Sequence, residues 1–376
     1  MSNLIHGGDL VSAAQRYGIP VEDWLDLSTG INPAAYPVPQ IDAALFQRLP
    51  YQSQAFSDAV ANYYGGEGLA CNGTQQAIEL LPKLSSERLV GEQITYPVLL
   101  PDCGYQEHRY SWQQAGAALK FYCANDHQQA VAQINQQLAK AEPCHLLLIN
   151  PNNPTGLQFS PEQVFSWAEQ MTEGSYLIVD EAFIDLCPEQ SLLNDYDRFQ
   201  QLGNLIVLRS FGKFFGLAGI RLGFVFAEPR LLNRLKTELG AWAVNGPAQA
   251  VAIDALNNQC WQQQARQQIA ANAEVTQALW QPLFDRVGAE LLCSRGLFLS
   301  ARLESEIAEK IYQFLAERGV LIRLVRGEEL GRSVQGISTE QSASICLLRS
   351  GLIDATEENQ CKKLEMVISE LLLTLE

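Results

Sequence analysis

Residues 210–223 read Ser-Phe-Gly-Lys-Phe-Phe-Gly-Leu-Ala-Gly-Ile-Arg-Leu-Gly and follow the apolar run at 204–209. Lys213 therefore lies among aromatic and small apolar residues just past an expected strand. Such surroundings desolvate an amine, lower its pKa and let the neutral form attack a carbonyl to make a Schiff base. A solvent-facing lysine is the weaker interpretation, because the neighbours on both sides are apolar. The stretch predicts a reactive lysine at a strand end.

The region around this stretch predicts an α/β domain. Between residues 88 and 227, apolar runs such as 144–149, 175–179 and 204–209 alternate with helical patterns. This alternation is typical of a largely parallel sheet. Between two of the runs, Ser160-Pro161-Glu162-Gln163 offers an N-cap, a proline at the first helical position and a capping-box glutamine. We expect a helix from there to about Thr172.

The length of 376 residues predicts two or three domains. We expect an arm and part of a small domain at 1–43, a large α/β domain at 44–240, and a small α+β domain at 241–376. Residues 229–288 look helical and bridge the domains. Strands are expected at 297–303 and near 320–324 and 344–349, with helices at 305–318 and 357–373.

Composition excludes several classes of protein. With 47% hydrophobic and 18% charged residues, the chain is globular. The net charge of −16 argues against nucleic acid as a partner but allows an anionic small molecule in a cleft lined by arginines. No apolar run approaches the roughly 18 residues of a membrane span, and the start of the chain has no signal-peptide pattern. Nine cysteines without a CxxC pair predict reduced thiols in a cytoplasmic protein.

Familiar catalytic motifs are missing from the sequence. The four histidines show no HExxH spacing, so we expect no metal site. There is no GxSxG elbow, P-loop or GxGxxG turn, which removes most hydrolase, kinase and dehydrogenase functions.

Three further motifs lie at expected strand ends or helix starts. Residues 150–156, Asn-Pro-Asn-Asn-Pro-Thr-Gly, follow a strand at the edge where open α/β sheets bind ligands, although alone they would indicate a turn. Asp180 ends the apolar run 176–179; a buried carboxylate needs a cation or a donor, and a helix N-cap is an equally good interpretation. Gly73-Thr74 precedes a helical run and would aim N–H groups at an anion, or be an ordinary helix start.

Taken together, these motifs complement one another. An anion-binding helix start, a strand-end carboxylate, a desolvated lysine and the arginine at 221 are the parts needed to hold pyridoxal 5′-phosphate (PLP).

In this ordered set the sequence resembles the fold-type I PLP-dependent enzymes, in the class I/II aminotransferase branch that includes histidinol-phosphate aminotransferase. The resemblance covers nearly the whole chain. It implies an α/β fold with a mostly parallel seven-stranded sheet in the large domain, a smaller α+β C-terminal domain, and a homodimer.

The resemblance also implies roles for individual residues. Lys213 would bind the cofactor aldehyde and act as general acid and base, Asp180 would keep the pyridine nitrogen protonated, and Asn153 would donate to the phenolic oxygen. Tyr105 would stack on the ring and is also expected to be a catalytic group. The phosphate would be held by Gly73, Thr74, Gln75, Ser210 and Arg221. The substrate would be bound by Arg349 and Gly30 at its carboxylate, by Arg323 at its phosphate with His6 as a helper, and by Asn153.

Within the branch, residues 6–8, 24–33, 105–108 with Trp112, and 180–185 are most similar to the threonine-phosphate decarboxylases of cobalamin biosynthesis. This similarity implies decarboxylation of L-threonine O-3-phosphate to (R)-1-aminopropan-2-yl phosphate. The alternatives are an aminotransferase acting on histidinol phosphate or a related amino acid, and a catalytically silent binding protein, against which Lys213 argues. The residue types do not separate decarboxylation from transamination, because the choice depends on which Cα bond is turned perpendicular to the ring.

Two positions depart from the aminotransferase pattern. Phe183 stands where many aminotransferases place a tyrosine that bonds the cofactor oxygen, which matches the decarboxylases better. Leu49 occupies the position of an aromatic residue that reaches the neighbouring subunit's cofactor phosphate, and Tyr51 is a candidate to replace it.

Overall fold

The computed structural model describes residues 4, 6–85, 87–89, 92–94, 96–294, 296–327 and 345–375. Contacts within the chain divide it into two compact units. The larger unit comprises residues 35–153 and 157–262, and the smaller unit comprises residues 1–34, 154–156 and 263–376. None of the helices in the described residues has the length and apolar character needed to cross a membrane.

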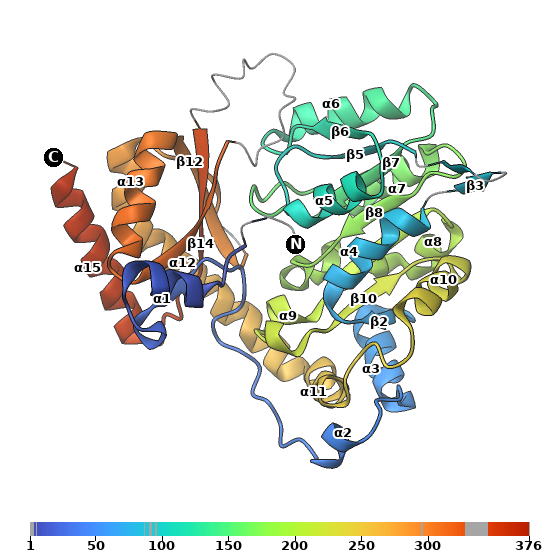
Figure 1. The fold of residues 1–376 in the computed structure, drawn as a ribbon, viewed down its shortest axis with the longest axis horizontal. Coiled ribbons are helices and arrows are strands. Elements are labelled where there is room, and N and C mark those ends of the chain that lie inside the picture. Colours follow the sequence, from blue (N-terminus) through green and yellow to red (C-terminus); the bar gives the residue numbers. More distant parts are fainter. Residues whose placement is uncertain are drawn as a thin grey trace. The chain divides into compact units, whose positions relative to one another are not determined.

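The larger unit is built on a seven-stranded sheet, which confirms the predicted fold class with a mostly parallel seven-stranded sheet (Figure 1). Six strands run parallel and β10 runs antiparallel between β2 and β9. In spatial order the strands are β2 (Leu69–Cys71), β10 (Gly223–Phe226), β9 (Leu205–Ser210), β8 (Leu177–Asp180), β7 (His145–Ile149), β5 (Val98–Pro101) and β6 (Leu119–Tyr122).

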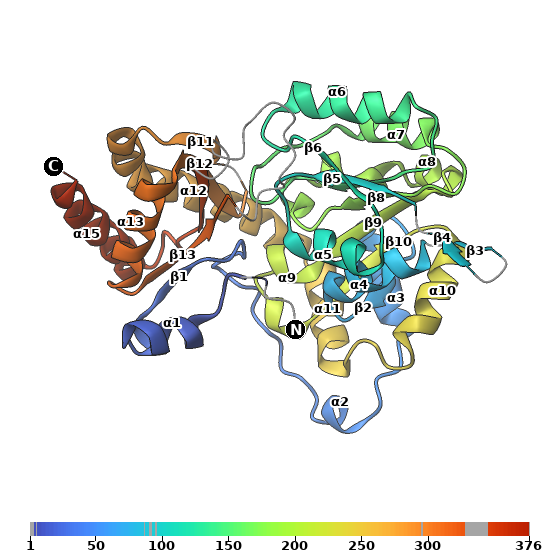
Figure 2. The ribbon, with the colours of Figure 1, turned by 45° about the horizontal axis from the view of Figure 1, so that its top comes forward.

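Helices cover both faces of this sheet. Apolar residues of α4, α5 and α10 pack with the strands in one core, and Figure 2 shows α6 and α7 on the opposite side. The predicted helix after Ser160 is α7, and the Ser160 hydroxyl accepts from the Gln163 amide, as the capping signal indicated. The helices of this unit are α2 (Ala44–Gln47), α3 (Gln54–Tyr64), α4 (Gly73–Leu84), α5 (Gln106–Gln114), α6 (His127–Leu138), α7 (Pro161–Gln170), α8 (Tyr196–Gln201), α9 (Phe211–Phe214), α10 (Pro229–Leu239) and α11 (Gly246–Asn257); a separate hairpin joins β3 (Glu87–Leu89) and β4 (Glu92–Ile94).

The smaller unit has a five-stranded mixed sheet with a core of its own. The N-terminal strand β1 (Leu25–Leu27) pairs parallel with β13 (Val320–Val325), and the other neighbours pair antiparallel. The remaining strands are β14 (Ile345–Gly351), β12 (Phe298–Glu304) and β11 (Glu290–Cys293); the helices are α1 (Leu10–Tyr17), α12 (Gln259–Val287), α13 (Ser305–Ala316) and α15 (Glu358–Thr374). The strands and helices expected in this region agree with these bounds to within a few residues, where the structure describes them.

The observed unit boundaries differ from the predicted ones at 43/44 and 240/241. They fall at 34/35 and 262/263, because α11 packs against α3 and stays with the larger unit. Tyr36 shows the same attachment: its hydroxyl donates to Asp254 of α11, and its ring contacts Trp261. These contacts join segments far apart in sequence, so composition along the chain does not reveal them.

Candidate active site

The strands of the larger sheet end along one edge. Ile149, Asp180 and Leu208 are neighbours in register, and Ser210 lies opposite Gly223 at the start of β10. Because the parallel strands all finish at this edge, the segments that follow them converge on one place. The convergence explains how motifs spread over some 150 residues of sequence reach a single pocket.

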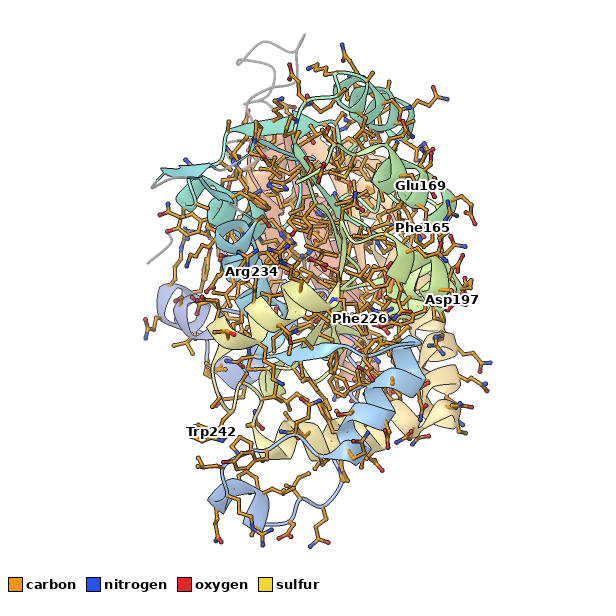
Figure 3. The ribbon with its side chains drawn as sticks, turned by 90° about the vertical axis from the view of Figure 1, so that its right-hand side faces the viewer. Phe165, Glu169, Asp197, Phe226, Arg234 and Trp242 are labelled. Carbon is orange, nitrogen blue, oxygen red and sulfur yellow. The ribbon has the colours of Figure 1, made fainter. Side chains whose placement is uncertain are left out.

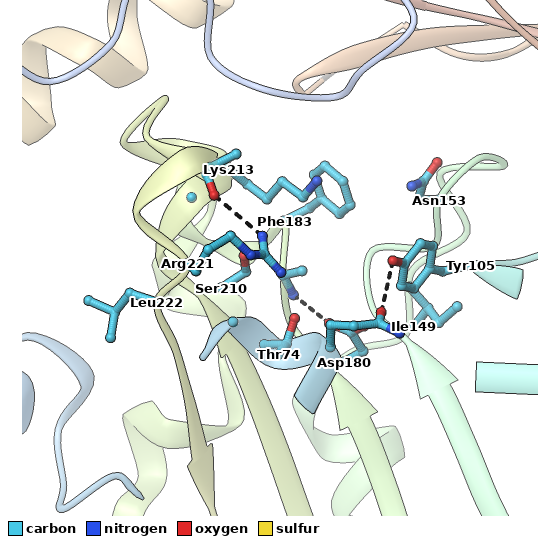
Figure 4. Close-up of a pocket in the computed structure, with 15 residues that line it drawn as sticks. Thr74, Tyr105, Ile149, Asn153, Asp180, Phe183, Ser210, Lys213, Arg221 and Leu222 are labelled. Atoms are coloured by element: carbon cyan, nitrogen blue, oxygen red, sulfur yellow. Dashed lines mark hydrogen bonds between the residues drawn. The ribbon is translucent and has the colours of Figure 1, made fainter. Parts of the chain in front are cut away.

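That pocket brings together every residue that the sequence predicted for the cofactor (Figure 4). Its lining includes Gly73, Thr74, Gln75, Tyr105, Asn153, Asp180, Ser210, Lys213 and Arg221. All of them belong to the larger unit.

One end of the pocket is suited to an anion. Helix α4 begins at Gly73, whose φ of 69° favours glycine, and a Cβ there would lie 2.7 Å from Nη2 of Arg221. A Cβ on Gly223 would lie 2.5 Å from the Thr74 amide nitrogen. The two glycines therefore allow a guanidinium and the first N–H groups of a twelve-residue helix to approach one another. Such a combination is chemically suited to an anion such as a phosphate group.

Gln75 links the helix start to Tyr105. The Tyr105 hydroxyl donates to Oε1 of Gln75 over 3.0 Å, and Nε2 of Gln75 donates to Glu107 over 3.0 Å. The side chain of Gln75 thus orients Tyr105, and its backbone lies in the first turn of α4. Burial, with Glu107 and Asp180 nearby, raises the pKa of Tyr105, so the phenol stays neutral at physiological pH.

Asp180 has the partner that its burial required. Its side chain is 5% exposed; Oδ2 lies 2.9 Å from Nε2 of His108, and Oδ1 accepts from the Ala182 amide over 3.0 Å. The second bond closes a turn onto the residue two positions along the chain, and it is not the helix N-cap that the sequence offered as an alternative, because the next helical turn, Ile184–Leu186, begins after Phe183. His108 was not among the predicted site residues. The signal that could have found it was the unmet need of Asp180 for a donor.

Lys213 lies on the short helix α9, which aromatic packing holds in place. Phe211 and Phe215 stack with ring centroids 4.3 Å apart, and Phe215 stacks in turn on Trp261. The Lys213 side chain points toward Phe183 (Figure 4), with Nζ 5.7 Å from the ring centroid. The predicted departure at Phe183 therefore places an aromatic face, rather than a hydroxyl, beside the amine.

A buried charge cluster lies next to these residues in sequence, and the sequence analysis missed it. Arg209, directly before Ser210, donates to Asp185 over 2.6 Å and lies 3.4 Å from Glu181, the residue after Asp180. Ser191 and Tyr63 add hydrogen bonds to Glu181 and Asp185. The cluster ties together the segments that carry Asp180 and Lys213.

Four of the five predicted substrate residues, His6, Gly30, Arg323 and Arg349, lie in the smaller unit, whereas Asn153 lies in the larger one. Arg323 of β13 and Arg349 of β14 are register partners, and each is 9% exposed. Burial and the nearby Arg323 lower the pKa of Arg349 to about 10, while Asp26 opposes the shift. His6 and Arg323 line a pocket of this unit together with Arg16 and Arg326. Gly30 is buried after β1 but is not among the residues that line it.

Comparisons with known proteins agree on a family. Residues 37–341 match the family model for aminotransferase class I and II. The chain is 39% identical over 327 residues to a threonine-phosphate decarboxylase of Pseudomonas aeruginosa, covering 85% of this chain and 89% of that protein.

Solved structures share the fold. The histidinol-phosphate aminotransferase of Sinorhizobium meliloti in complex with pyridoxal-5′-phosphate matches with a TM-score of 0.72 at 19% identity, over 98% of this chain and 96% of that one. The L-threonine-O-3-phosphate decarboxylase of Porphyromonas gingivalis matches with a TM-score of 0.66 at 17% identity, over 91% of this chain and 99% of that one. At these identities the matches show the fold alone.

Proposed function

Because the chain belongs to the aminotransferase class I and II family, we propose that it is a PLP-dependent enzyme and that the pocket of the larger unit holds the cofactor. The pocket residues fit this group. Arg221 and the start of α4 suit its phosphate, and Asp180 is a buried carboxylate for its ring nitrogen. Lys213 supplies an amine for its aldehyde.

The residues of the pocket would share the chemistry as follows. When bound, PLP supplies an electron sink for the bonding pair released at the substrate Cα. Asp180, held by His108, would keep a proton on the pyridine nitrogen. Lys213 would hold the aldehyde carbon and later deliver a proton to Cα. Asn153 would donate to the phenolic oxygen, and Tyr105 would stack on the ring, fixed by Gln75.

For the reaction, we propose decarboxylation of L-threonine O-3-phosphate to (R)-1-aminopropan-2-yl phosphate, a step of cobalamin biosynthesis. The observation that carries the proposal is the 39% identity to a threonine-phosphate decarboxylase over most of both chains. The positions of Arg323 and Arg349, which are register partners on paired strands, support it, since a substrate with a phosphate and a carboxylate offers one anion to each.

The test is a stoichiometric carbon dioxide assay on the purified holoenzyme. We expect release of carbon dioxide from threonine phosphate and at least a hundredfold lower kcat/KM, on the order of 3 kcal/mol, with plain threonine, which lacks the dianion for Arg323. Transfer of the amino group to 2-oxoglutarate without release of carbon dioxide would establish the aminotransferase alternative. Lys213→Ala should abolish turnover and change the visible absorbance of the cofactor; an unchanged spectrum and rate would refute the assignment of Lys213.

We also propose that the enzyme is a cytoplasmic homodimer. The nine cysteines all lie in the described part of the chain and none forms a disulfide there, in keeping with a reducing compartment. The larger unit exposes apolar side chains around α2 and the segment after α10, and such a surface suits a second copy of the chain. These side chains are Val38, Phe46, Leu49, Tyr51 and Trp242, which we call the α2 patch.

A further inference from the structure

The turn after β1 in the smaller unit is held by a single carboxylate. Oδ1 of Asp26 accepts from the Ser28 amide over 2.8 Å and from the Ser28 hydroxyl over 2.5 Å. Ser28 is 2% exposed, so water does not compete for these bonds. The turn has one defined geometry, and Asp26 sets it.

The N-terminal arm is attached to this turn. Because the Ser28 hydroxyl gives its proton to Asp26, its oxygen is left to accept, and it receives the Gly8 amide over 2.7 Å. The backbones also lie in close contact: a Cβ on Gly7 would come within 2.0 Å of the Ser28 carbonyl oxygen. The arm residue next to these glycines is His6, which lines the pocket that contains Arg323.

The same turn holds Arg349. Nη2 of Arg349 donates to the Ser28 carbonyl oxygen. Two residues after Arg349, the backbone of strand β14 lies in close contact with the turn: a Cβ on Gly351 would lie 2.3 Å from the Thr29 carbonyl oxygen. Ser28 therefore contacts the arm through its hydroxyl and Arg349 through its carbonyl, and one carboxylate orients both groups.

We propose that Asp26 and Ser28 are positioning residues that couple the N-terminal arm to Arg349, so that the substrate carboxylate meets a guanidinium whose direction is set by the turn. The inference rests on the proposed role of Arg349 in binding that carboxylate. Neither residue touches a reacting atom. They should therefore affect substrate binding rather than the bond-breaking step.

Steady-state kinetics on the holoenzyme test the positioning. Asp26→Ala should raise KM for threonine phosphate about tenfold and leave kcat within about twofold, because a lost hydrogen bond to a charged group has an effect of this size. Asp26→Asn should restore KM to within about threefold of wild type, since its amide oxygen can accept both bonds. An asparagine variant as impaired as the alanine variant would overturn the proposal.

A matched control exists in the same unit. Asp354 accepts from the Thr356 amide and hydroxyl in a turn of the same kind, and among the residues that the structure describes neither an arginine nor the arm donates to it. Asp354→Ala should leave KM unchanged. A rise in KM as large as that of Asp26→Ala would show a general stability effect and refute the inference.

A double-mutant cycle identifies the group through which Asp26 acts. In an Arg349→Gln background, Asp26→Ala should raise KM by less than about twofold, because the guanidinium it positions is gone. If the increase in KM of the double variant equalled the product of the increases in the two single variants, the residues would act independently and the coupling would be contradicted.

Amide hydrogen exchange gives a measurement that does not depend on turnover. Ser28→Ala should speed exchange in the peptide that contains Gly8 at least tenfold, with the peptides of the larger sheet unchanged. Equal exchange in wild type and variant would overturn the attachment of the arm. If exchange at Gly8 is slow in wild type and faster in Ser28→Ala, but the wild-type enzyme releases no carbon dioxide, the result would count against the proposed function alone.

Discussion

At the residue scale, Asp180 shows how a buried charge is made tolerable. Its two oxygens are each engaged, one by the His108 ring and one by the Ala182 amide, so the carboxylate is satisfied without solvent. The arrangement leaves Asp180 able to act on a ring nitrogen and makes His108 its support.

Variants of this pair should separate their roles. We expect Asp180→Asn to lower kcat by at least about a hundredfold, because the ring nitrogen loses the charge that retains its proton. His108→Phe removes one hydrogen bond to a charged group, and we expect a loss of about tenfold to a hundredfold. Single-turnover measurement of carbon dioxide release gives both values. If His108→Phe had full activity, His108 would have no role in supporting Asp180.

A second histidine, His145, affects stability rather than chemistry. It is fully buried in β7, where Nδ1 accepts from the Tyr176 amide and the ring stacks on Tyr176. Burial lowers the pKa of His145 to about 4 from the ordinary 6.5. The folded state therefore favours the neutral ring, and its contribution is complete above pH 6.5 and is lost as the pH falls toward 4.

This shift predicts acid sensitivity. As the pH falls from 7 to 4, protonation of His145 should lower the free energy of unfolding by about 3 kcal/mol, at 1.36 kcal/mol per unit of pKa shift. In His145→Asn, whose Oδ1 can accept from the Tyr176 amide, this part of the pH dependence should disappear, although lost packing lowers stability at pH 7. Urea unfolding of both proteins at several pH values measures the difference. Parallel pH profiles would contradict the prediction.

At the element scale, the active site depends on how closely two elements approach. The start of α4 and the start of β10 are separated by about 150 residues of sequence, and glycine at position 223 allows their backbones to meet. This contact brings Arg221 to the N–H groups at the start of α4.

Gly223→Ala tests the approach. The added methyl group would lie 2.5 Å from the Thr74 amide nitrogen and must displace the start of α4. We expect the dissociation constant for PLP to rise about tenfold, because oriented N–H groups and the guanidinium bind phosphate through short charge-assisted bonds. Absorbance titration of the apoenzyme measures it. Gly203→Ala, where no atom lies within 4 Å of the new group, is the control and should bind PLP normally.

The buried cluster of Arg209, Glu181 and Asp185 joins the ends of β8 and β9. Arg209→Met would leave two buried carboxylates without their positively charged partner, and we expect it to lower the free energy of unfolding by about 3–5 kcal/mol. The control is Arg198→Met, which breaks the exposed pair with Glu169 (labelled in Figure 3) and should cost less than about 1 kcal/mol. If the two variants lowered the free energy of unfolding equally in urea, burial of the cluster would not increase its contribution to stability.

At the scale of the whole molecule, we expect the α2 patch to form the interface of the proposed homodimer. Tyr51 contacts Trp242, which is labelled in Figure 3, edge to face with ring centroids 6.4 Å apart, and both side chains are exposed. Large exposed aromatic side chains are typical of protein interfaces.

Charge in this patch should therefore disrupt the dimer. We expect wild type to be dimeric at micromolar concentration and Trp242→Asp to weaken association at least a hundredfold, as measured by light scattering coupled to gel filtration. Val11→Asp, an exposed apolar site in the smaller unit, is the control and should stay dimeric. A monomeric wild type would refute the proposed homodimer.

Much of the protein is determined by local sequence. The strand and helix patterns predicted the fold class, and the seven-stranded sheet and the family match confirm it. Lys213, Asp180, Arg221 and the Gly73-Thr74 step could be singled out from local sequence, because strand ends and helix starts depend on a few neighbouring residues. Gln75, Tyr105, Asn153 and Ser210 were predicted for the cofactor through the family resemblance. The structure places all of them around one pocket.

The remaining features were decided by tertiary structure. His108 faces Asp180 across 72 residues, Arg349 reaches the Ser28 carbonyl across 321, and α11 stays with the larger unit through α3. Each depends on which surfaces meet after the chain has folded, and hydrophobic periodicity carries no information about such pairings. Local sequence thus determined the elements and the chemistry at their ends, whereas packing between distant elements determined which partner holds each charged group.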